Sequence, residues 1–222
     1  MKKHIIVTGA TGLAGSEVVR QAILDKDIET ITALVRSPLP IQHPKLNIVL
    51  HENFRDYSAL RDLFASHDSC IWCLGISQSQ VKEDEYIRIT YDYAVTAAQA
   101  MLNANPRITF LFLSGMGADS QEKSRALFAR IKGKAENNLK RLPFKKLYIA
   151  RPGGIIPVHK KKNPALFERF LIPLMPIINF VAPSTMISSV DLAKAMLDVV
   201  KNGSDRIVLE NMALKKRLVK PK

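Results

Sequence analysis

Three glycines near the start of the chain have the spacing of a phosphate-binding turn. Gly9, Gly12 and Gly15 follow the apolar run 4–8 directly, and a helical pattern begins within the same segment. Glycines at a strand-to-helix turn let the backbone turn tightly and approach a pyrophosphate, whose charge is stabilised by the free N–H groups of the helix start. The strand before and the helix after supply the context that this motif needs. The spacing therefore predicts a dinucleotide-binding site.

The second apolar run, 30–35, ends next to Arg36 and Ser37. In a dinucleotide-binding fold the residue about 20 positions beyond the glycines meets the adenosine ribose, and an acid there binds the 2′-hydroxyl. A guanidinium instead pairs with a 2′-phosphate and stacks on the adenine. Arg36 therefore predicts NADP(H) in preference to NAD(H). The alternative is that Arg36 is only a solvated residue at a strand end.

Three more loops are expected at the same sheet edge, because each follows an apolar run. Residues 53–55, which include Phe54, are placed to flank the adenine. Residues 73–75 end in a glycine that lets the backbone approach the cofactor ribose, and residues 113–115 lie beside the expected nicotinamide.

Strand-like runs alternate with helical patterns, which predicts an α/β fold. A parallel sheet covered on both faces and connected by right-handed crossovers is a doubly wound sheet, the Rossmann fold. We expect one domain over residues 1–222, with a later helix at 190–201 and a last strand at 206–210. The strand-like runs are 4–8, 30–35, 46–50, 69–74, 108–113 and 144–150, and the helical patterns are 13–25, 56–66, 83–104 and 121–141.

The segment 155–187 is rich in proline and large apolar side chains. A membrane-spanning helix needs about 20 uninterrupted apolar residues, which Glu168, Arg169 and several prolines prevent. We therefore expect a short helix and loop over the C-terminal edge of the sheet, as a lid or substrate-binding insertion, because ligands bind at that edge. A segment that contacts a membrane surface is the alternative.

The formal net charge of +13 favours anionic partners: a phosphorylated cofactor, nucleic acid or an acidic membrane surface. The basic clusters 159–162 and 215–222 contain no interleaved aromatic residues, so they indicate a solvated loop and tail. A nucleic-acid function thus rests on charge alone. The first strand begins almost at once, which leaves no room for a signal peptide, and we expect a cytoplasmic protein.

Neither the cysteines nor the histidines predict a metal site or a disulfide. Cys70 and Cys73 lie in one strand-like run, where residues three apart point to opposite faces, so we expect two core thiols. The histidines are scattered without metal-ligand spacing.

Several segments resemble the atypical short-chain dehydrogenase/reductases, in particular the Tat-interactive-protein-like oxidoreductases and NAD(P)H-binding epimerase-like proteins. The matching segments are 8–12, 73–75, 113–119, 131–136 and 151–153. The resemblance implies a carbonyl or sugar-nucleotide-like small-molecule substrate, and we expect a monomer or homodimer. With the patterns above, it gives as expected cofactor contacts Gly9, Thr11, Gly12, Leu13, Gly15, Arg36, Ser37, Phe54, Cys73, Leu74, Gly75, Leu113, Lys132, Arg151, Pro152 and Gly153.

The family's chemistry uses a serine, a tyrosine and a lysine, with the tyrosine four residues before the lysine on one helix. The lysine lowers the pKa of the phenol and holds the nicotinamide ribose, and the phenol exchanges the proton that accompanies hydride transfer. Ser114 matches the serine and Lys132 the lysine, but Phe128 stands at the tyrosine position. Loss of a positioned acid–base group typically costs about 10²–10⁴-fold in rate.

Two functions therefore stay open. One is an NADP(H)-dependent oxidoreductase of low or atypical activity, in which Ser114, Lys132, water or another tyrosine relays the proton. The other is a non-catalytic NADPH-sensing protein, in which the bound cofactor orders residues 155–187 and changes a partner surface. The tyrosines considered as substitutes are Tyr86, Tyr91, Tyr93 and Tyr148.

Overall fold

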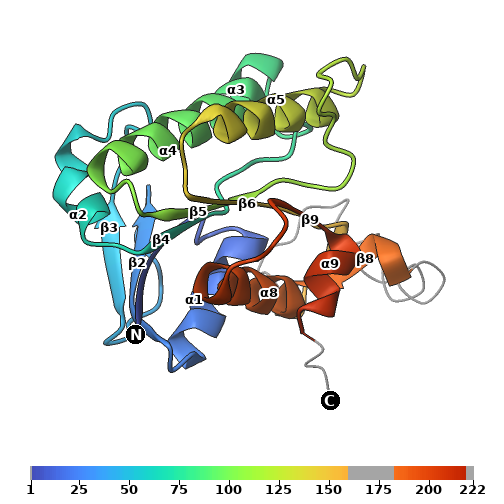
Figure 1. The fold of residues 1–222 in the computed structure, drawn as a ribbon. Coiled ribbons are helices and arrows are strands. Elements are labelled where there is room, and N and C mark those ends of the chain that lie inside the picture. Colours follow the sequence, from blue (N-terminus) through green and yellow to red (C-terminus); the bar gives the residue numbers. More distant parts are fainter. Residues whose placement is uncertain (1, 160–182, 219–222) are drawn as a thin grey trace.

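A computed structural model describes residues 2–159 and 183–218, in which two helical layers enclose a parallel sheet (Figure 1). Within these residues the main sheet has seven strands in the order β3-β2-β1-β4-β5-β6-β9, and every neighbouring pair is parallel. The strand order reverses beside β1, as the doubly wound fold predicts. The strands are β1 (Lys3–Thr8), β2 (Ile28–Val35), β3 (Leu46–Leu50), β4 (Ser69–Trp72), β5 (Thr109–Leu113), β6 (Lys146–Arg151) and β9 (Val208–Glu210).

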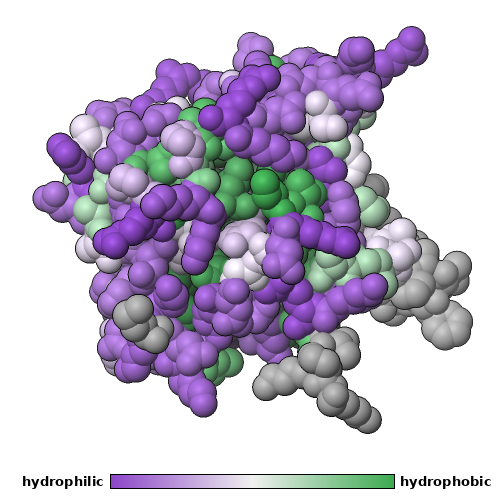
Figure 2. All heavy atoms as spheres, in the orientation of Figure 1, coloured by the Kyte–Doolittle hydropathy of each residue, from purple (hydrophilic) through white to green (hydrophobic). Residues whose placement is uncertain are grey.

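Helices cover both faces of the sheet (Figure 1). One layer holds α1 (Leu13–Leu24), α8 (Ser189–Asn202) and α9 (Asn211–Lys216). The other holds η1 (Ser58–Leu60), α2 (Arg61–Ala65), α3 (Glu83–Ile87), the π-helical turn η2 (Arg88–Asp92), α4 (Tyr93–Ala104) and α5 (Leu127–Arg141). Figure 2 shows apolar side chains between the two layers, where β6 and β9 lie, and mainly hydrophilic ones over the helices. Buried apolar side chains of α1 and α8 belong to one core, and those of α4 and α5 to the other.

Alternating strand residues build two separate cores, one under each helical layer. Val7 belongs to the core under α1 and α8, whereas its neighbour Ile6 belongs to the core under α4 and α5. Cys70 lies in the second core and Cys73 packs against the first, and both are free thiols. The prediction that the two cysteines point to opposite faces is confirmed.

The helix expected at 121–141 begins only at Leu127, so the predicted start is wrong. The Asp119 carboxylate accepts hydrogen bonds from the backbone N–H groups of Gln121, Lys123 and Ser124, at 2.7–2.9 Å. An aspartate that satisfies the backbone in this way stabilises a turn in competition with a helix. Glu122 also has a φ of 60°, which a helix excludes.

The C-terminal part contains elements that the sequence did not predict. Within 155–187 we expected a helix and loop, but the described ends of this range form a small parallel sheet of β7 (Gly154–Ile156) and β8 (Met186–Ser188), with the 3₁₀ turn η4 (Pro183–Thr185) before β8. The rest of the predicted lid lies outside the described residues. The basic tail was expected to be irregular, yet part of it belongs to α9. The described residues contain no helix long and apolar enough to span a membrane.

Candidate functional site

The glycine turn after β1 has the backbone geometry that the sequence predicted. Gly9 has a φ of +65°, and a Cβ on it would lie 2.4 Å from the Cys73 carbonyl oxygen. A Cβ on Gly15 would lie 2.2 Å from the Gly9 carbonyl oxygen, so only glycine lets α1 pack this close to the end of β1. Gly12 is the N-cap residue of α1 and supplies no capping side chain. The N–H groups of the first turn therefore remain available to an anion.

Thr8 connects this turn to the end of β4, a role that sequence reasoning missed. Its buried Oγ1 accepts hydrogen bonds from the backbone N–H groups of Cys73 and Leu74, both at 3.2 Å. The loops after β1 and β4 are thereby fixed side by side at the C-terminal edge of the sheet. Gly75 follows them and is exposed. A threonine at the end of a buried strand is only a weak sequence signal for such a connection, because these residues usually only pack in the core.

Arg36 and Ser37 lie where the sequence placed them, directly after β2 and exposed to solvent. Within the described part of the chain Arg36 has no ion-pair or hydrogen-bond partner. Thr11 is likewise exposed and Leu13 is half-buried, at the start of α1. The Arg36 guanidinium is therefore free to meet a phosphate at this edge.

Phe54 does not present its side chain to this edge. The ring is 2% exposed and lies in an aromatic cluster with Tyr57, Trp72 and Tyr93, at centroid distances of 5.8–6.3 Å. A contact of residues 53–55 with the adenine would therefore involve the backbone of Phe54 or the neighbouring residues, and it stays a prediction.

Ser114 and Lys132 come together at the end of β5, although they are far apart in sequence. The Lys132 Nζ donates a hydrogen bond to the Leu113 carbonyl oxygen at 2.8 Å and lies 4.7 Å from the centroid of the Phe112 ring. Burial lowers the pKa of Lys132 to about 8, while the charges of Glu136 and Cys73 act in the opposite direction. The site thus contains a buried lysine whose pKa lies much closer to neutral pH than that of a solvated lysine.

A buried carboxylate completes this cluster, and sequence reasoning assigned it no role. Glu136 is fully buried, and its Oε1 accepts a hydrogen bond from Ser114 Oγ at 2.5 Å. Arg151 binds both carboxylate oxygens, through Nε at 2.8 Å and Nη2 at 2.6 Å. The four-residue spacing of Lys132 and Glu136 on α5 is the signal that could have revealed it, because such residues share a helix face.

Phe128 lies at the reactive end, in the first turn of α5. A Cβ built on Gly115 would lie 2.7 Å from Cζ of the Phe128 ring, so the para carbon faces the residue next to Ser114. The Phe128 ring therefore lies against Gly115 and offers no hydroxyl group there. Its backbone N–H donates to the Gln78 Oε1 at 2.9 Å, which ties the start of α5 to the loop after β4.

The residues of the segment 151–153 make contacts within the protein. Arg151 is bound to Glu136, and its Nη1 also pairs with Glu210 Oε1 at 3.0 Å. Pro152 is buried, and the Gly153 N–H donates to the side chain of Asn211 at 2.9 Å. Contacts of this segment with a cofactor remain predictions for its backbone.

One of the four candidate tyrosines is excluded as a substitute acid. The Tyr148 hydroxyl accepts a hydrogen bond from the Ser204 N–H at 3.2 Å, in the loop after α8 and thus at the opposite edge of the sheet from Ser114. Tyr86 is buried, and Tyr91 lies under the Lys134 ammonium, 4.5 Å from the ring centroid. A substitute role for Tyr86, Tyr91 or Tyr93 stays a prediction.

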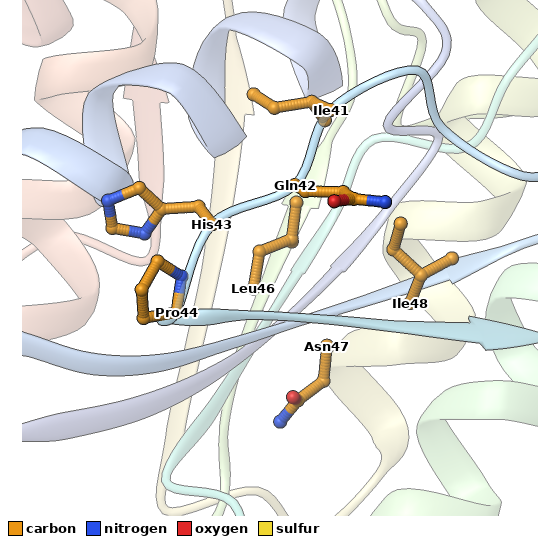
Figure 3. Close-up of a pocket in the computed structure, with 7 residues that line it drawn as sticks. All are labelled: Ile41, Gln42, His43, Pro44, Leu46, Asn47 and Ile48. Carbon is orange, nitrogen blue, oxygen red and sulfur yellow. The ribbon is translucent and has the colours of Figure 1, made fainter.

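An open pocket of about 510 Å³ lies elsewhere, where the loop before β3 runs beside that edge strand (Figure 3). Leu46 and Ile48 point to one side of β3 and Asn47 to the other. Its lining residues, 41–44 and 46–48, include neither the glycine turn nor any other predicted site residue. Within the described residues no group of three histidine, cysteine or acidic side chains is placed to hold a metal.

The parallel sheet, the glycine turn and the uncapped start of α1 define a dinucleotide-binding protein of the Rossmann type. Residues 9–203 match a family model described as NAD(P)H-binding, and the chain belongs to that family. It is an NAD(P)H-binding, oxidoreductase-like protein that is similar to the atypical short-chain dehydrogenase/reductases and epimerases.

Two relatives illustrate the similarity in sequence. The protein HTATIP2 of Rattus norvegicus is 26% identical over 218 residues, which cover 96% of this chain and 88% of HTATIP2. The leucinostatins biosynthesis cluster protein T of Purpureocillium lilacinum is 32% identical over 160 residues, 68% of this chain and 58% of that protein.

Solved structures share the fold at low sequence identity. The PhqB reductase domain of Penicillium fellutanum has a TM-score of 0.69 at 16% identity and covers 90% of this chain, which spans 64% of that domain. The Bordetella bronchiseptica enzyme WbmF, solved with NAD⁺, has a TM-score of 0.69 at 13% identity. The match covers 98% of this chain and 77% of WbmF. A UDP-N-acetylglucosamine 4-epimerase of Methanobrevibacter ruminantium was solved with UDP-N-acetylmuramic acid. It has a TM-score of 0.67 at 20% identity, and the match covers 94% of this chain and 76% of the epimerase.

Proposed function

We propose that this protein binds NADP(H) in preference to NAD(H) and acts as an oxidoreductase of low activity on a small carbonyl or sugar-nucleotide-like substrate. The observation that carries the proposal is the glycine turn with the uncapped start of α1, which lies at the same sheet edge as Ser114 and Lys132. WbmF, solved with NAD⁺, and the epimerase, solved with UDP-N-acetylmuramic acid, support a nicotinamide cofactor and a sugar-nucleotide-like substrate.

The preference for NADP(H) rests on Arg36. Its exposed guanidinium has no partner among the described residues, and Ser37 beside it adds a hydroxyl group. A 2′-phosphate would bind here through charge-assisted hydrogen bonds, whereas a 2′-hydroxyl would gain little from the positive charge.

The substitution Arg36→Ala tests this preference. We expect the Kd for NADPH, measured by cofactor fluorescence, to rise about 10- to 100-fold, because a hydrogen bond to a charged group contributes about 1.5–3 kcal/mol. The Kd for NADH serves as the control and should change little. The preference is falsified if the variant binds NADPH as tightly as the parent protein.

The expected chemistry is hydride transfer, which the nicotinamide ring supplies when the cofactor is bound. We assign the binding of the ribose hydroxyls to Lys132 and the contact with the reacting oxygen of the substrate to Ser114. Phe128 offers no proton at the position of the family's acid, so these two residues or water must move the proton less efficiently. A low turnover follows from this difference.

A second function, an NADPH-sensing protein without turnover, is favoured by the same phenylalanine. The variant Phe128→Tyr separates the two functions, because its hydroxyl would extend from the para carbon that faces Gly115. The measurement is NADPH oxidation with a panel of small carbonyl compounds. The control Phe144→Tyr adds the same hydroxyl beside the start of β6, at the opposite edge of the sheet.

Weak turnover by the parent protein that rises about 10²-fold in Phe128→Tyr alone would support the oxidoreductase. Tight NADPH binding without parent turnover, with activity only in Phe128→Tyr, would favour the sensor. Robust parent turnover would exclude the sensor and point to a substitute acid. If neither NADPH nor NADH binds, the proposed function fails.

A further inference from the structure

Ser114 and Glu136 form a short hydrogen bond at the end of β5, with Ser114 as the donor. The Ser114 Oγ lies 2.5 Å from the Glu136 Oε1, and both residues are buried. The other described contacts of this carboxylate are with positive groups: Arg151 donates to its two oxygens at 2.8 and 2.6 Å, and the Lys140 Nζ lies 3.8 Å from Oε2. Such contacts stabilise an ionised carboxylate, which can only accept hydrogen bonds. The hydroxyl hydrogen of Ser114 therefore points to Glu136.

This hydrogen bond decides what Ser114 can offer to a ligand. A serine hydroxyl has one hydrogen to donate and two lone pairs that accept. Because the hydrogen of Ser114 is bound to Glu136, its Oγ presents only lone pairs to a ligand. A ligand hydroxyl group can donate to these lone pairs, whereas a carbonyl oxygen, which carries no hydrogen, cannot.

We infer that Glu136 is a positioning residue that fixes Ser114 as a hydrogen-bond acceptor, so that the site binds the hydroxyl form of its substrate in preference to the carbonyl form. The inference rests on the proposed function, because an oxidoreductase binds both forms, one as its substrate and the other as its product. The preferred ligand class is thus an alcohol.

The buried ion pair keeps the serine in this orientation. For Ser114 to donate to a carbonyl ligand, its hydroxyl must rotate away from the Glu136 carboxylate. A hydrogen bond to a charged acceptor is stronger than one to a neutral carbonyl group, so the carboxylate retains the hydrogen. The Phe128 ring against Gly115 supplies no hydroxyl group that could donate in place of Ser114.

The experiment compares two unreactive ligands, 1-methylcyclohexanol and cyclohexanone, on the protein saturated with NADP⁺. The ketone needs a hydride that NADP⁺ does not carry, and the tertiary alcohol has no hydrogen on its carbinol carbon to transfer. Ligand-observed NMR measures the Kd of each compound. We expect the parent protein to bind the alcohol about fivefold more tightly than the ketone, which is the contribution of one neutral hydrogen bond.

The double variant Glu136→Leu/Arg151→Met removes the device that orients Ser114. It replaces a buried ion pair by apolar side chains, a change that proteins often tolerate. The Ser114 hydroxyl then has no carboxylate acceptor and is free to donate to the ligand. We expect the ketone to bind about fivefold more tightly than it binds to the parent protein. A merely structural role of Glu136 predicts no such gain, because damage to the site only weakens binding.

Glu210→Gln is the matched control, because Glu210 pairs with the same arginine through Nη1 at 3.0 Å but is exposed. This variant should keep the preference of the parent protein for the alcohol. Ser114→Ala carries the test if the double variant does not fold, since it leaves the pair of Glu136 and Arg151 in place. In Ser114→Ala the affinity for the alcohol should fall about fivefold, and that for the ketone should change little.

The inference is overturned if the parent protein binds the ketone as tightly as the alcohol, if it binds neither compound, or if Ser114→Ala keeps the preference. A folded double variant without a gain in affinity for the ketone would also contradict it. If the parent protein binds neither NADP⁺ nor NADPH, the proposed function fails. If the cofactor binds and the preference for the alcohol is absent, this inference alone fails.

Discussion

The glycine turn after β1 and the polar cluster after β5 lie at the same edge of the sheet but are built in opposite ways. At the turn, function depends on side chains that are absent, because a Cβ on Gly9 or Gly15 would overlap a backbone carbonyl. At the cluster, polar side chains occupy the edge: Arg151 binds both oxygens of the buried Glu136, and the buried Lys132 donates to the Leu113 carbonyl oxygen.

This difference explains why the two regions carry unequal information about function. The turn admits few residue types, so its presence argues strongly for a bound dinucleotide. At the cluster, Ser114 and Lys132 are present while Phe128 stands four residues before Lys132. We therefore test cofactor binding and catalysis as separate properties.

The largest effect is expected from Gly15→Ala. Its methyl group would lie 2.2 Å from the Gly9 carbonyl oxygen, so α1 must move away from the turn. We expect a loss of about 1–3 kcal/mol in the free energy of unfolding. NADPH affinity should fall about 100-fold, because the displaced N–H groups no longer meet the phosphates.

The control for Gly15→Ala is Gly75→Ala, and urea denaturation measures the free energy of unfolding of both variants. A Cβ on Gly75 meets no atom within 4 Å, so the unfolding free energy should stay nearly unchanged. Equal effects of the two substitutions would contradict the distinction between the turn and the rest of the edge.

A smaller effect of opposite sign is expected from Lys132→Met, which removes a buried charge. Because burial lowers the pKa of Lys132 to about 8, folding at pH 7 pays to keep the ammonium charged. We expect the variant to be more stable at pH 7 by about 2 kcal/mol. The folded-state pKa is lower than the unfolded one, so this gain should shrink as the pH rises from 8 to about 10.5, where both states are neutral. Thermal unfolding at pH 7 and pH 10 measures this change in stability. A variant that is less stable than the parent at pH 7 would contradict the prediction. The affinity of the variant for NADPH should also fall.

The smallest effect is expected from Ser114→Ala. Arg151 still binds both oxygens of Glu136 in this variant, so only one hydrogen bond is lost, at a cost of about 1 kcal/mol. NADPH affinity should stay close to that of the parent, whereas any turnover should drop. A large loss of cofactor affinity would show that the turn and the cluster are not separable.

The sequence predicted the sheet, its order of strands and helices and the position of the glycine turn, because these depend on local patterns. It was wrong about the start of α5, where Asp119 binds backbone N–H groups in place of a first helical turn. It also could not indicate that the Phe54 ring lies in the core, where aromatic partners from other elements hold it, so the predicted contact of residues 53–55 with the adenine stays a prediction.

The residues alone thus determined that the chain binds a dinucleotide, since hydrophobic periodicity and glycine geometry act over a few neighbouring positions. Only the tertiary structure decided the contacts of the reactive end. Ser114, Glu136 and Arg151 come from β5, α5 and β6, and parallel strands joined by crossover helices bring such distant residues to one edge. The burial of Lys132 beside them lowers its pKa, and this burial depends on the packing of α5 against the end of β5.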